Sequence, residues 1–311
     1  MIVTLSIMVI IVCAVGIKQS FGNEKGESAQ AASTKISASK LTQIIKDNKA
    51  KYYPKTDWLK KHPQDLQLSS KGAVILDYNT NEVLLDNNMH TKLPPASITK
   101  VLTSLVALET YGKDKLCTVS QEAADTEAYK IIMKPGEKLR VEDLVYGMMM
   151  ISANDAAEVI AECDPGGKQA FIDKMNEKVK ELGLTDSHFV TPNGLDDPEH
   201  YASAFDMATI TAYAIRTQPE FLTFMGRVDD YSVAATDHNE AHSYYQLSTL
   251  LKTFPGMEGA KTGYTDTAGN TYIGVGSRDG RRVIIVYLNA YSKTYDATTM
   301  LEQGFFLNPS S

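Results

Sequence analysis

The chain has 311 residues, of which 43% are hydrophobic and 22% are charged, a balance typical of one large globular domain or two small ones. The formal net charge of -7 argues against a nucleic-acid partner, because phosphate binding requires a basic face that this composition does not supply. The three cysteines, Cys13, Cys117 and Cys163, are too dispersed for a disulfide scaffold or a zinc site, and we expect neither a metal nor a cofactor. Cys117 and Cys163 can pair if Cys13 is removed with a leader, but we expect two buried free thiols.

Residues 1–22 have the features of a signal peptide or an N-terminal anchor. Residues 2–17 form an apolar run without a charge, and Ser20, Phe21 and Gly22 make a small-x-small pattern that a signal peptidase recognises. No basic residue precedes the run and it is short for a membrane span, so cleavage and retention as an anchor stay open. We expect an exported protein whose membrane attachment, if any, goes through this segment.

Residues 23–70 precede the part of the chain that carries chemistry. Residues 23–40 are rich in Ser, Ala, Gly, Lys and Glu and lack apolar periodicity, which predicts a flexible tether. Residues 41–70 include a short predicted helix near 41–49 and the single tryptophan, Trp58. We assign no chemistry to them.

Strand patterns lie at both ends of the remaining chain. A β-branched run at 73–78 meets a second run at 82–85 across turn residues, which predicts a hairpin. A second hairpin is predicted from 271–276 and 283–288, which flank a turn that contains Asp279 and Gly280.

Helical patterns fill the region between these hairpins. Apolar residues at helical spacing predict helices over 97–111 and 141–151, the first of which ends at Gly112, and another helix is predicted at 297–306. The sequence therefore predicts an α+β fold, in which an antiparallel sheet from both chain ends is flanked by helices and a helical subdomain is inserted at roughly 113–240.

The first motif that could take part in catalysis is Ser97-Ile98-Thr99-Lys100, at the start of the helix predicted over 97–111. A lysine one turn after a serine shares its face and can act as its base if burial or a nearby cation keeps the amine neutral. The same pattern occurs from Ser37 to Lys40 in the tether. Alone, the motif is equally consistent with a helix-capping serine followed by a solvated lysine.

Two further motifs each occur once. Ser152-Ala153-Asn154 lies between two predicted helices, and Lys261-Thr262-Gly263 precedes the second hairpin. Taken singly, the first is consistent with helix capping and the second with an exposed strand and a turn glycine. The three motifs together, however, follow the order typical of penicillin-binding proteins and class A β-lactamases.

In these motifs the chain resembles the low-molecular-mass penicillin-binding proteins that act as serine D-alanyl-D-alanine carboxypeptidases. The likeness runs from about residue 72 to residue 306. It includes the segments PASITK at 95–100, SANDAA at 152–157, LGL at 182–184, TPNGL at 191–195, HYASAFD at 200–206 and GMEGAKTGYT at 256–265. The resemblance implies a serine β-lactamase or penicillin-binding-protein-like fold, with the catalytic domain at 71–311.

The resemblance also implies roles for individual residues. Ser97 is acylated, Lys100 accepts its proton, and Ser152 relays a proton to the departing D-alanine. The implied substrate-binding residues are Asn154, Lys261, Thr262, Gly263 and Tyr264. Among them, Asn154 would hold the substrate amide, Lys261 and Thr262 would bind the terminal carboxylate, and Tyr264 would contribute a backbone N–H to the oxyanion hole. The backbone N–H of Ser97 would complete the oxyanion hole, and repulsion from Lys261 would keep Lys100 neutral.

The implied substrate is a peptidoglycan stem peptide that ends in D-Ala-D-Ala, and β-lactam antibiotics are the implied covalent inhibitors. A class A β-lactamase would need a Glu-x-x-x-Asn pattern between residues 154 and 261, and none is present. A non-catalytic penicillin-sensor domain is the other alternative. Relatives often carry a C-terminal β domain, which we do not expect here because the sequence ends at Ser311.

Other polar residues that match the family are interpreted as structural, because polar residues in a loop before a helix commonly cap it. These are Asn193, His200, Tyr201 and Asp206. A second group of acidic residues is expected to cap or solvate a helix start. It consists of Glu137, Glu142 and Asp143.

Overall fold

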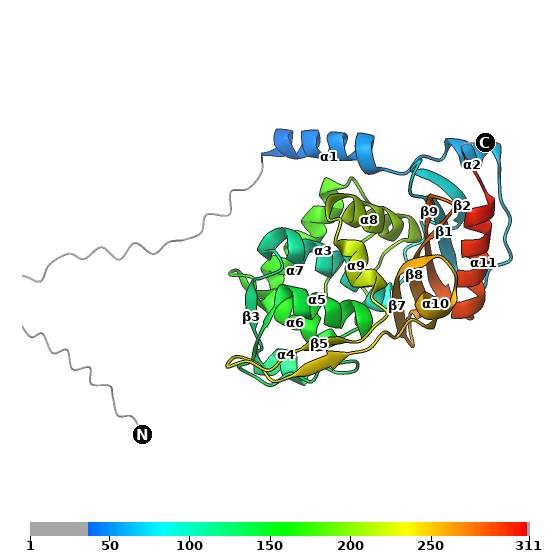
Figure 1. Ribbon diagram of the computed structural model, residues 1–311. Coiled ribbons are helices and arrows are strands. Elements are labelled where there is room, and N and C mark those ends of the chain that lie inside the picture. Colours follow the sequence, from blue (N-terminus) through cyan, green and yellow to red (C-terminus); the bar gives the residue numbers. More distant parts are fainter. Residues whose placement is uncertain (1–36, 310–311) are drawn as a thin grey trace, which may run out of the picture. The chain divides into compact units, whose positions relative to one another are not determined.

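The computed structural model describes residues 37–309, which belong to one compact unit (Figure 1). Across this part of the chain, no helix has the length and apolar character needed to cross a membrane. The helices are α1 (Ala38–Tyr52), α2 (Asp57–Lys61), η1 (Ala96–Thr99), α3 (Lys100–Tyr111), α4 (Gln121–Asp125), α5 (Val141–Met150), α6 (Asn154–Glu162), α7 (Gly167–Glu181), α8 (Ala204–Thr217), α9 (Phe221–Gly226), α10 (Thr249–Thr253) and α11 (Lys293–Phe306).

A five-stranded antiparallel sheet joins the two ends of this unit. Its strand order is β2-β1-β9-β8-β7, so that β1 from the N-terminal side pairs with β9 from the C-terminal side. Both predicted hairpins are confirmed, as β1–β2 and β8–β9. The strands of this sheet are β1 (Gly72–Asp77), β2 (Glu82–Asn87), β7 (Met257–Thr265), β8 (Gly269–Arg278) and β9 (Arg281–Ala290). The predicted α+β class and the sheet made from both chain ends are therefore confirmed.

Both faces of the sheet are covered, which explains why β1 is buried along its whole length. Alternate side chains such as Ile75, Ile285 and Tyr287 face α11, whereas Val74 and Val286 face the core of the helical region. Figure 1 shows α11 on one side of the sheet and helices α8 and α9 on the other. This alternation is the period-two pattern of a strand between two apolar layers.

The helical region also contains two short hairpins, formed by β3 (Leu116–Thr118) with β4 (Lys138–Arg140) and by β5 (Tyr231–Val233) with β6 (His242–Tyr244). The helix predicted at 97–111 is divided into the 3-10 turn η1 and the helix α3. Gly112 adopts a positive φ of 68° directly after α3, as a helix-terminating glycine does.

The segment before β1 is more ordered than we predicted. Helix α1 extends the short helix expected at 41–49 at both ends, so residues 38–40 of the predicted tether form its first turn. The remainder of the tether, like the predicted signal or anchor, lies outside the described residues. Trp58, on α2, packs against the sheet core on the α11 side and stacks on His62.

The prediction of two free thiols was wrong. Cys117 and Cys163 form a disulfide that links β3 to the end of α6, with a Cα–Cα distance of 5.3 Å. The two cysteines are 46 residues apart in sequence, so only the packing of β3 against α6 brings them together.

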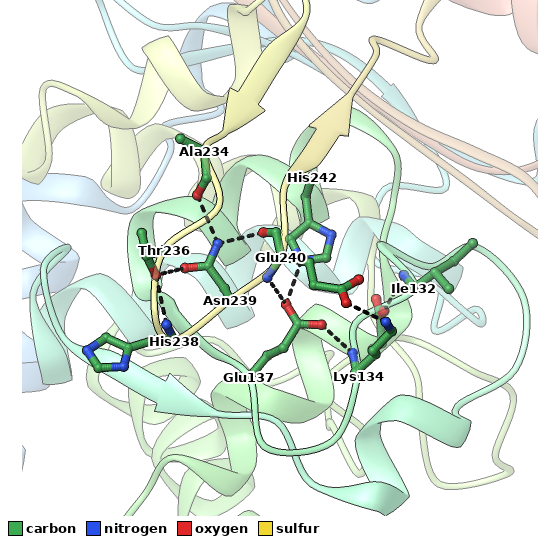
Figure 2. A network of polar contacts seen from close by, with 10 residues as sticks. Ile132, Lys134, Glu137, Ala234, Thr236, His238, Asn239, Glu240 and His242 are labelled. Atoms are coloured by element: carbon green, nitrogen blue, oxygen red, sulfur yellow. Dashed lines mark hydrogen bonds and ion pairs between the residues drawn. The ribbon is translucent and has the colours of Figure 1, made fainter.

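Glu137 does not cap or solvate a helix start, contrary to our expectation. Its buried carboxylate accepts hydrogen bonds from the backbone N–H of Lys134 at 2.6 Å and of Glu240 at 3.0 Å, and lies 2.8 Å from Nε2 of His242 (Figure 2). It thereby joins the loop before β4 to the β5–β6 hairpin. Glu142 and Asp143 do lie in the first turn of α5, where both are bonded to Arg140.

Candidate active site

Ser97 lies in the short 3-10 turn η1, at the edge of the sheet. The turn begins at Ala96 with a positive φ of 50°, a conformation that non-glycine residues adopt rarely. Thr271 of β8 donates a hydrogen bond of 2.8 Å to the carbonyl of Pro95 and so ties the turn to the sheet. The Ser97 hydroxyl caps no helix, and it accepts a hydrogen bond of 2.9 Å from Nζ of Lys100.

Lys100 is fully buried and its amine is the centre of the site. Besides Ser97, Nζ donates to Oδ1 of Asn154 at 2.7 Å and to the backbone carbonyl of Asn193 at 2.6 Å. Burial lowers the pKa of Lys100 well below its ordinary value, and the nearby ammonium of Lys261 lowers it further. A lysine in this state can give up its proton at a pH where free lysine cannot.

Ser152 and Asn154 come from the connection between α5 and α6. Ser152 has a positive φ of 61°, and its buried hydroxyl accepts a hydrogen bond of 3.0 Å from Nζ of Lys261. Asn154 does not cap α6. Its Oδ1 faces Lys100 and its Nδ2 donates to the carbonyl of Glu127 at 2.9 Å, which fixes the orientation of the amide.

Strand β7, the edge strand of the sheet, supplies the third motif and passes directly beside Ser97. A Cβ atom added to Gly263 would lie only 2.9 Å from the backbone nitrogen of Ser97 and 2.3 Å from Oγ1 of Thr271, so glycine is required for this approach. Burial lowers the pKa of Lys261 to about 7. Because β7 is an edge strand, its outward backbone groups have no strand partner among the described residues.

A groove opens along this edge. Its lining includes Ser97, Ser152 and the β7 residues Thr262, Gly263 and Tyr264. It continues past β7 to the start of α11, where Lys293 and Thr294 line it, and exposed tyrosines at 129 and 264 lie on its rim. All eight sequence-predicted site residues are thus brought together around one cleft, either by direct contact or as its lining.

The second Ser-x-x-Lys pattern has a different environment. Ser37 caps α1 through a hydrogen bond from the backbone N–H of Lys40, and both residues are exposed. The capping interpretation therefore applies to Ser37 and not to Ser97.

Sequence reasoning missed the contribution of Asn193, whose main-chain carbonyl contacts Lys100. A backbone acceptor leaves no signal in the residue type. His200, which we expected to be structural, is buried. Its Nε2 lies 2.9 Å from Oγ1 of Thr99, and its Nδ1 accepts a hydrogen bond from the backbone N–H of Val190. Its ring nitrogens bond to Thr99, Val190 and Thr191 and not to Ser97 or Lys100.

A serine hydroxyl beside a buried amine of lowered pKa, with a second serine, an amide and a second amine around one groove, is the arrangement of a serine acyl-transfer site. Within residues 37–309, no group of three His, Cys, Asp or Glu side chains is placed to hold a metal. The chemistry available to these side chains is nucleophilic attack with proton transfer between hydroxyls and amines.

Comparison with known proteins places this site in a family. The family model described as D-alanyl-D-alanine carboxypeptidase, peptidase family S11, matches residues 59–292. The chain belongs to this family. The carboxypeptidase DacF of Bacillus subtilis is 33% identical over 255 residues, which cover 79% of this chain and 64% of DacF, so the match spans less than two thirds of that relative.

Solved structures agree with this assignment. A D-alanyl-D-alanine carboxypeptidase from Mycobacterium tuberculosis is similar with a TM-score of 0.72 and 28% identity, covering 80% of this chain and 96% of the other. The Streptomyces K15 DD-transpeptidase is similar with a TM-score of 0.73 and 25% identity, covering 78% and 100%. The predicted penicillin-binding-protein-like fold is therefore confirmed.

Proposed function

We propose that this protein is a serine D,D-carboxypeptidase that removes the terminal D-alanine from peptidoglycan stem peptides. The observation that carries the proposal is the position of Lys100, whose Nζ lies 2.9 Å from the Ser97 hydroxyl in a site that disfavours its protonated form. A base held this way can take the serine proton as the hydroxyl attacks a carbonyl.

In the acylation step, Ser97 Oγ forms a bond to the carbonyl carbon of the penultimate D-alanine and its proton passes to Lys100. The backbone N–H groups of Ser97 and Tyr264 stabilise the oxyanion. Collapse breaks the peptide bond. The proton taken up by Lys100 is relayed through Ser152, which contacts Lys261, to the amine of the departing D-alanine, so that Lys100 and Ser152 return to their starting protonation states. The amide of Asn154 orients the substrate, and Lys261, Thr262 and the neighbouring backbone at Gly263 bind its terminal carboxylate.

In the second step, water attacks the acyl-Ser97 ester with Lys100 as the base, and the shortened peptide leaves. A β-lactam acylates the same hydroxyl, but its amine stays attached and obstructs the water. The chain lacks the Glu-x-x-x-Asn pattern that activates water in class A β-lactamases, so we expect slow release and inhibition.

The proposed catalytic domain comprises residues 71–311, with the helical subdomain at roughly 113–240. The proposed location is extracytoplasmic, by way of the signal or anchor at 1–22. The disulfide between Cys117 and Cys163 supports export, because disulfides persist in oxidising compartments.

The test is release of D-alanine from a peptide ending in D-Ala-D-Ala, together with labelling by a fluorescent penicillin. Ser97→Ala should reduce both by at least about a thousandfold. Ser37→Ala is a matched control, since it removes the serine of the other Ser-x-x-Lys pattern, and it should leave both unchanged.

Equal D-alanine release by the parent and Ser97→Ala would refute the assignment. Stable penicillin labelling without peptide hydrolysis would favour a sensor, and rapid turnover of the penicillin would favour a β-lactamase. Transfer of the acyl group to an added amine at the expense of hydrolysis would favour a transpeptidase.

A further inference from the structure

A buried carboxylate behind the site has no part in the mechanism described above. Glu158 lies on α6 one turn after Asn154, so both side chains share a helix face, and it is 4% exposed. Its Oε1 accepts a hydrogen bond of 2.6 Å from Nδ2 of Asn193. The main-chain carbonyl of Asn193 in turn accepts the 2.6 Å hydrogen bond from Lys100. Glu158 is thus linked to the base through a single residue.

The loop that carries Asn193 is held closely against the nucleophile. Thr103 of α3 donates a hydrogen bond of 2.6 Å to the carbonyl of Pro192. A Cβ atom on Gly194 would lie 2.0 Å from the carbonyl oxygen of Ala96, so the loop backbone touches the Ser97 turn. Glu158 and the backbone N–H of Leu195 hold the side chain of Asn193, the residue between these two contacts, so loss of Glu158 removes one of the two hydrogen bonds that orient it.

The negative charge of Glu158 also acts on Lys100. Lys168 of α7, 37% exposed, forms an ion pair of 2.6 Å with Oε2. Burial raises the pKa of Glu158, whereas Lys168 lowers it, and the carboxylates of Glu162 and Glu122 raise it further.

We propose that Glu158 is a positioning residue for acylation, which orients the Asn193 carbonyl towards Lys100 and opposes the positive field of Lys261 there. This inference rests on the proposed function and adds a residue to it. The titratable groups that face Lys100 are Lys261 on β7, the carboxylates of Glu158 and Asp155 on α6, and the ring of His200 before α8. The lysine favours the neutral amine, and the two carboxylates favour the ammonium.

Two variants distinguish the hydrogen bond of Glu158 to Asn193 from the effect of its negative charge on Lys100. Glu158→Gln keeps an acceptor oxygen for Asn193 and removes the negative charge, so the pKa of Lys100 falls. The acidic limb of the acylation pH profile, which reports the loss of the Lys100 proton, should move to lower pH. Glu158→Ala removes the hydrogen bond as well, and the acylation rate at its optimum should fall about tenfold or more.

The experiment measures the second-order rate of acylation of the full chain by a fluorescent penicillin across the pH range. Glu162→Gln is the matched control, because it removes a carboxylate one turn further along α6 that forms no hydrogen bond with Asn193 or Lys100 and acts on Glu158 only through its charge. Its profile should coincide with that of the parent. Thermal unfolding of every variant shows whether a slow rate comes from loss of fold.

A Glu158→Gln profile that coincides with the parent profile, or moves to higher pH, would overturn the inference. So would parent-like acylation by a folded Glu158→Ala. If Glu158→Ala does not fold, the Glu158→Gln profile still decides. A parent chain that neither reacts with penicillin nor releases D-alanine refutes the proposed function itself, which is a distinct result.

Discussion

Hydrogen bonding fixes both the tautomer and the charge of His200. Nδ1 accepts backbone N–H groups from Val190 and Thr191, so the ring proton is on Nε2, which donates to Oγ1 of Thr99. A second proton on Nδ1 would face two N–H donors inside a buried site. Burial accordingly lowers the pKa of His200 to about 4.

This shift makes His200 a source of acid sensitivity. Between its ordinary pKa of 6.5 and the folded value of about 4, the unfolded chain binds a proton that the folded chain does not. The His200 contribution to stability is thus lost as the pH falls through this window, by up to about 3 kcal/mol. His200→Gln should therefore destabilise the protein at neutral pH and cost progressively less on acidification, as measured by urea unfolding at several pH values.

Asp206 changes the stability of the protein with pH in the opposite direction to His200. Burial raises the pKa of its carboxyl from 3.8 to about 6, so it contributes stability that is present below pH 3.8 and lost as the pH rises through 6. The parent curve contains both contributions, and only the difference between parent and variant isolates His200. A difference that does not change between pH 6.5 and 4 would contradict the assigned state of the ring.

Single site residues could be predicted from the sequence where the side chain forms the contact, but not where the main chain does. Ser97 and Lys100 were predictable because their spacing puts both side chains on one helical face and because two further motifs follow in the order typical of penicillin-binding proteins. The Asn193 carbonyl was not, since a backbone acceptor is the same in every residue. Glu158 was equally hidden, because its contact with Asn193 joins positions 35 residues apart.

At the scale of elements, the disulfide joins a short strand to a helix that carries part of the site. It closes a loop of 46 residues between β3 and the end of α6, whose first residue is Asn154. Closing a loop of this length restricts the unfolded chain and stabilises a protein by about 2 to 4 kcal/mol. Reduction, or a Cys117→Ala and Cys163→Ala double variant, should lower the urea midpoint by a corresponding amount.

The Cys13→Ser variant provides the background for this measurement, because it leaves only the paired cysteines in the chain. Alkylation of the denatured, unreduced protein followed by mass spectrometry should then detect no free thiol. Two alkylated cysteines, or a urea midpoint that reduction leaves unchanged, would contradict the bond and restore the free-thiol prediction.

The elements themselves were predictable where a strand or helix has a strong apolar period. The β1–β2 and β8–β9 hairpins follow from β-branched runs separated by turn residues. We did not predict β7 as a strand of the same sheet. Its central part contains Lys261 and Gly263, which are not typical strand residues. Lys261 is nevertheless buried, because its side chain lies in the site.

At the scale of the whole molecule, the sheet depends on both ends of the described chain. Asp296 on α11 is fully buried and accepts hydrogen bonds from the backbone N–H of Ser69 at 3.0 Å and of Ser70 at 2.8 Å, and from the Ser69 hydroxyl at 2.9 Å. The next residue, Lys71, donates its N–H to the carbonyl of Leu288 on β9. Asp296 thus fixes the entry of β1 to the last helix.

Asp296→Ala should therefore lower the free energy of unfolding by about 3 kcal/mol, because it leaves buried N–H donors without an acceptor. Glu302→Gln is the matched control on the same helix, since its exposed ion pair with Arg278 contributes less than about 1 kcal/mol. Penicillin acylation and circular dichroism should be lost at the same urea concentration in every variant, because β7, β8 and β9 belong to the sheet that β1 completes. An Asp296→Ala midpoint equal to that of Glu302→Gln would show that the two ends of the chain contribute independently to stability.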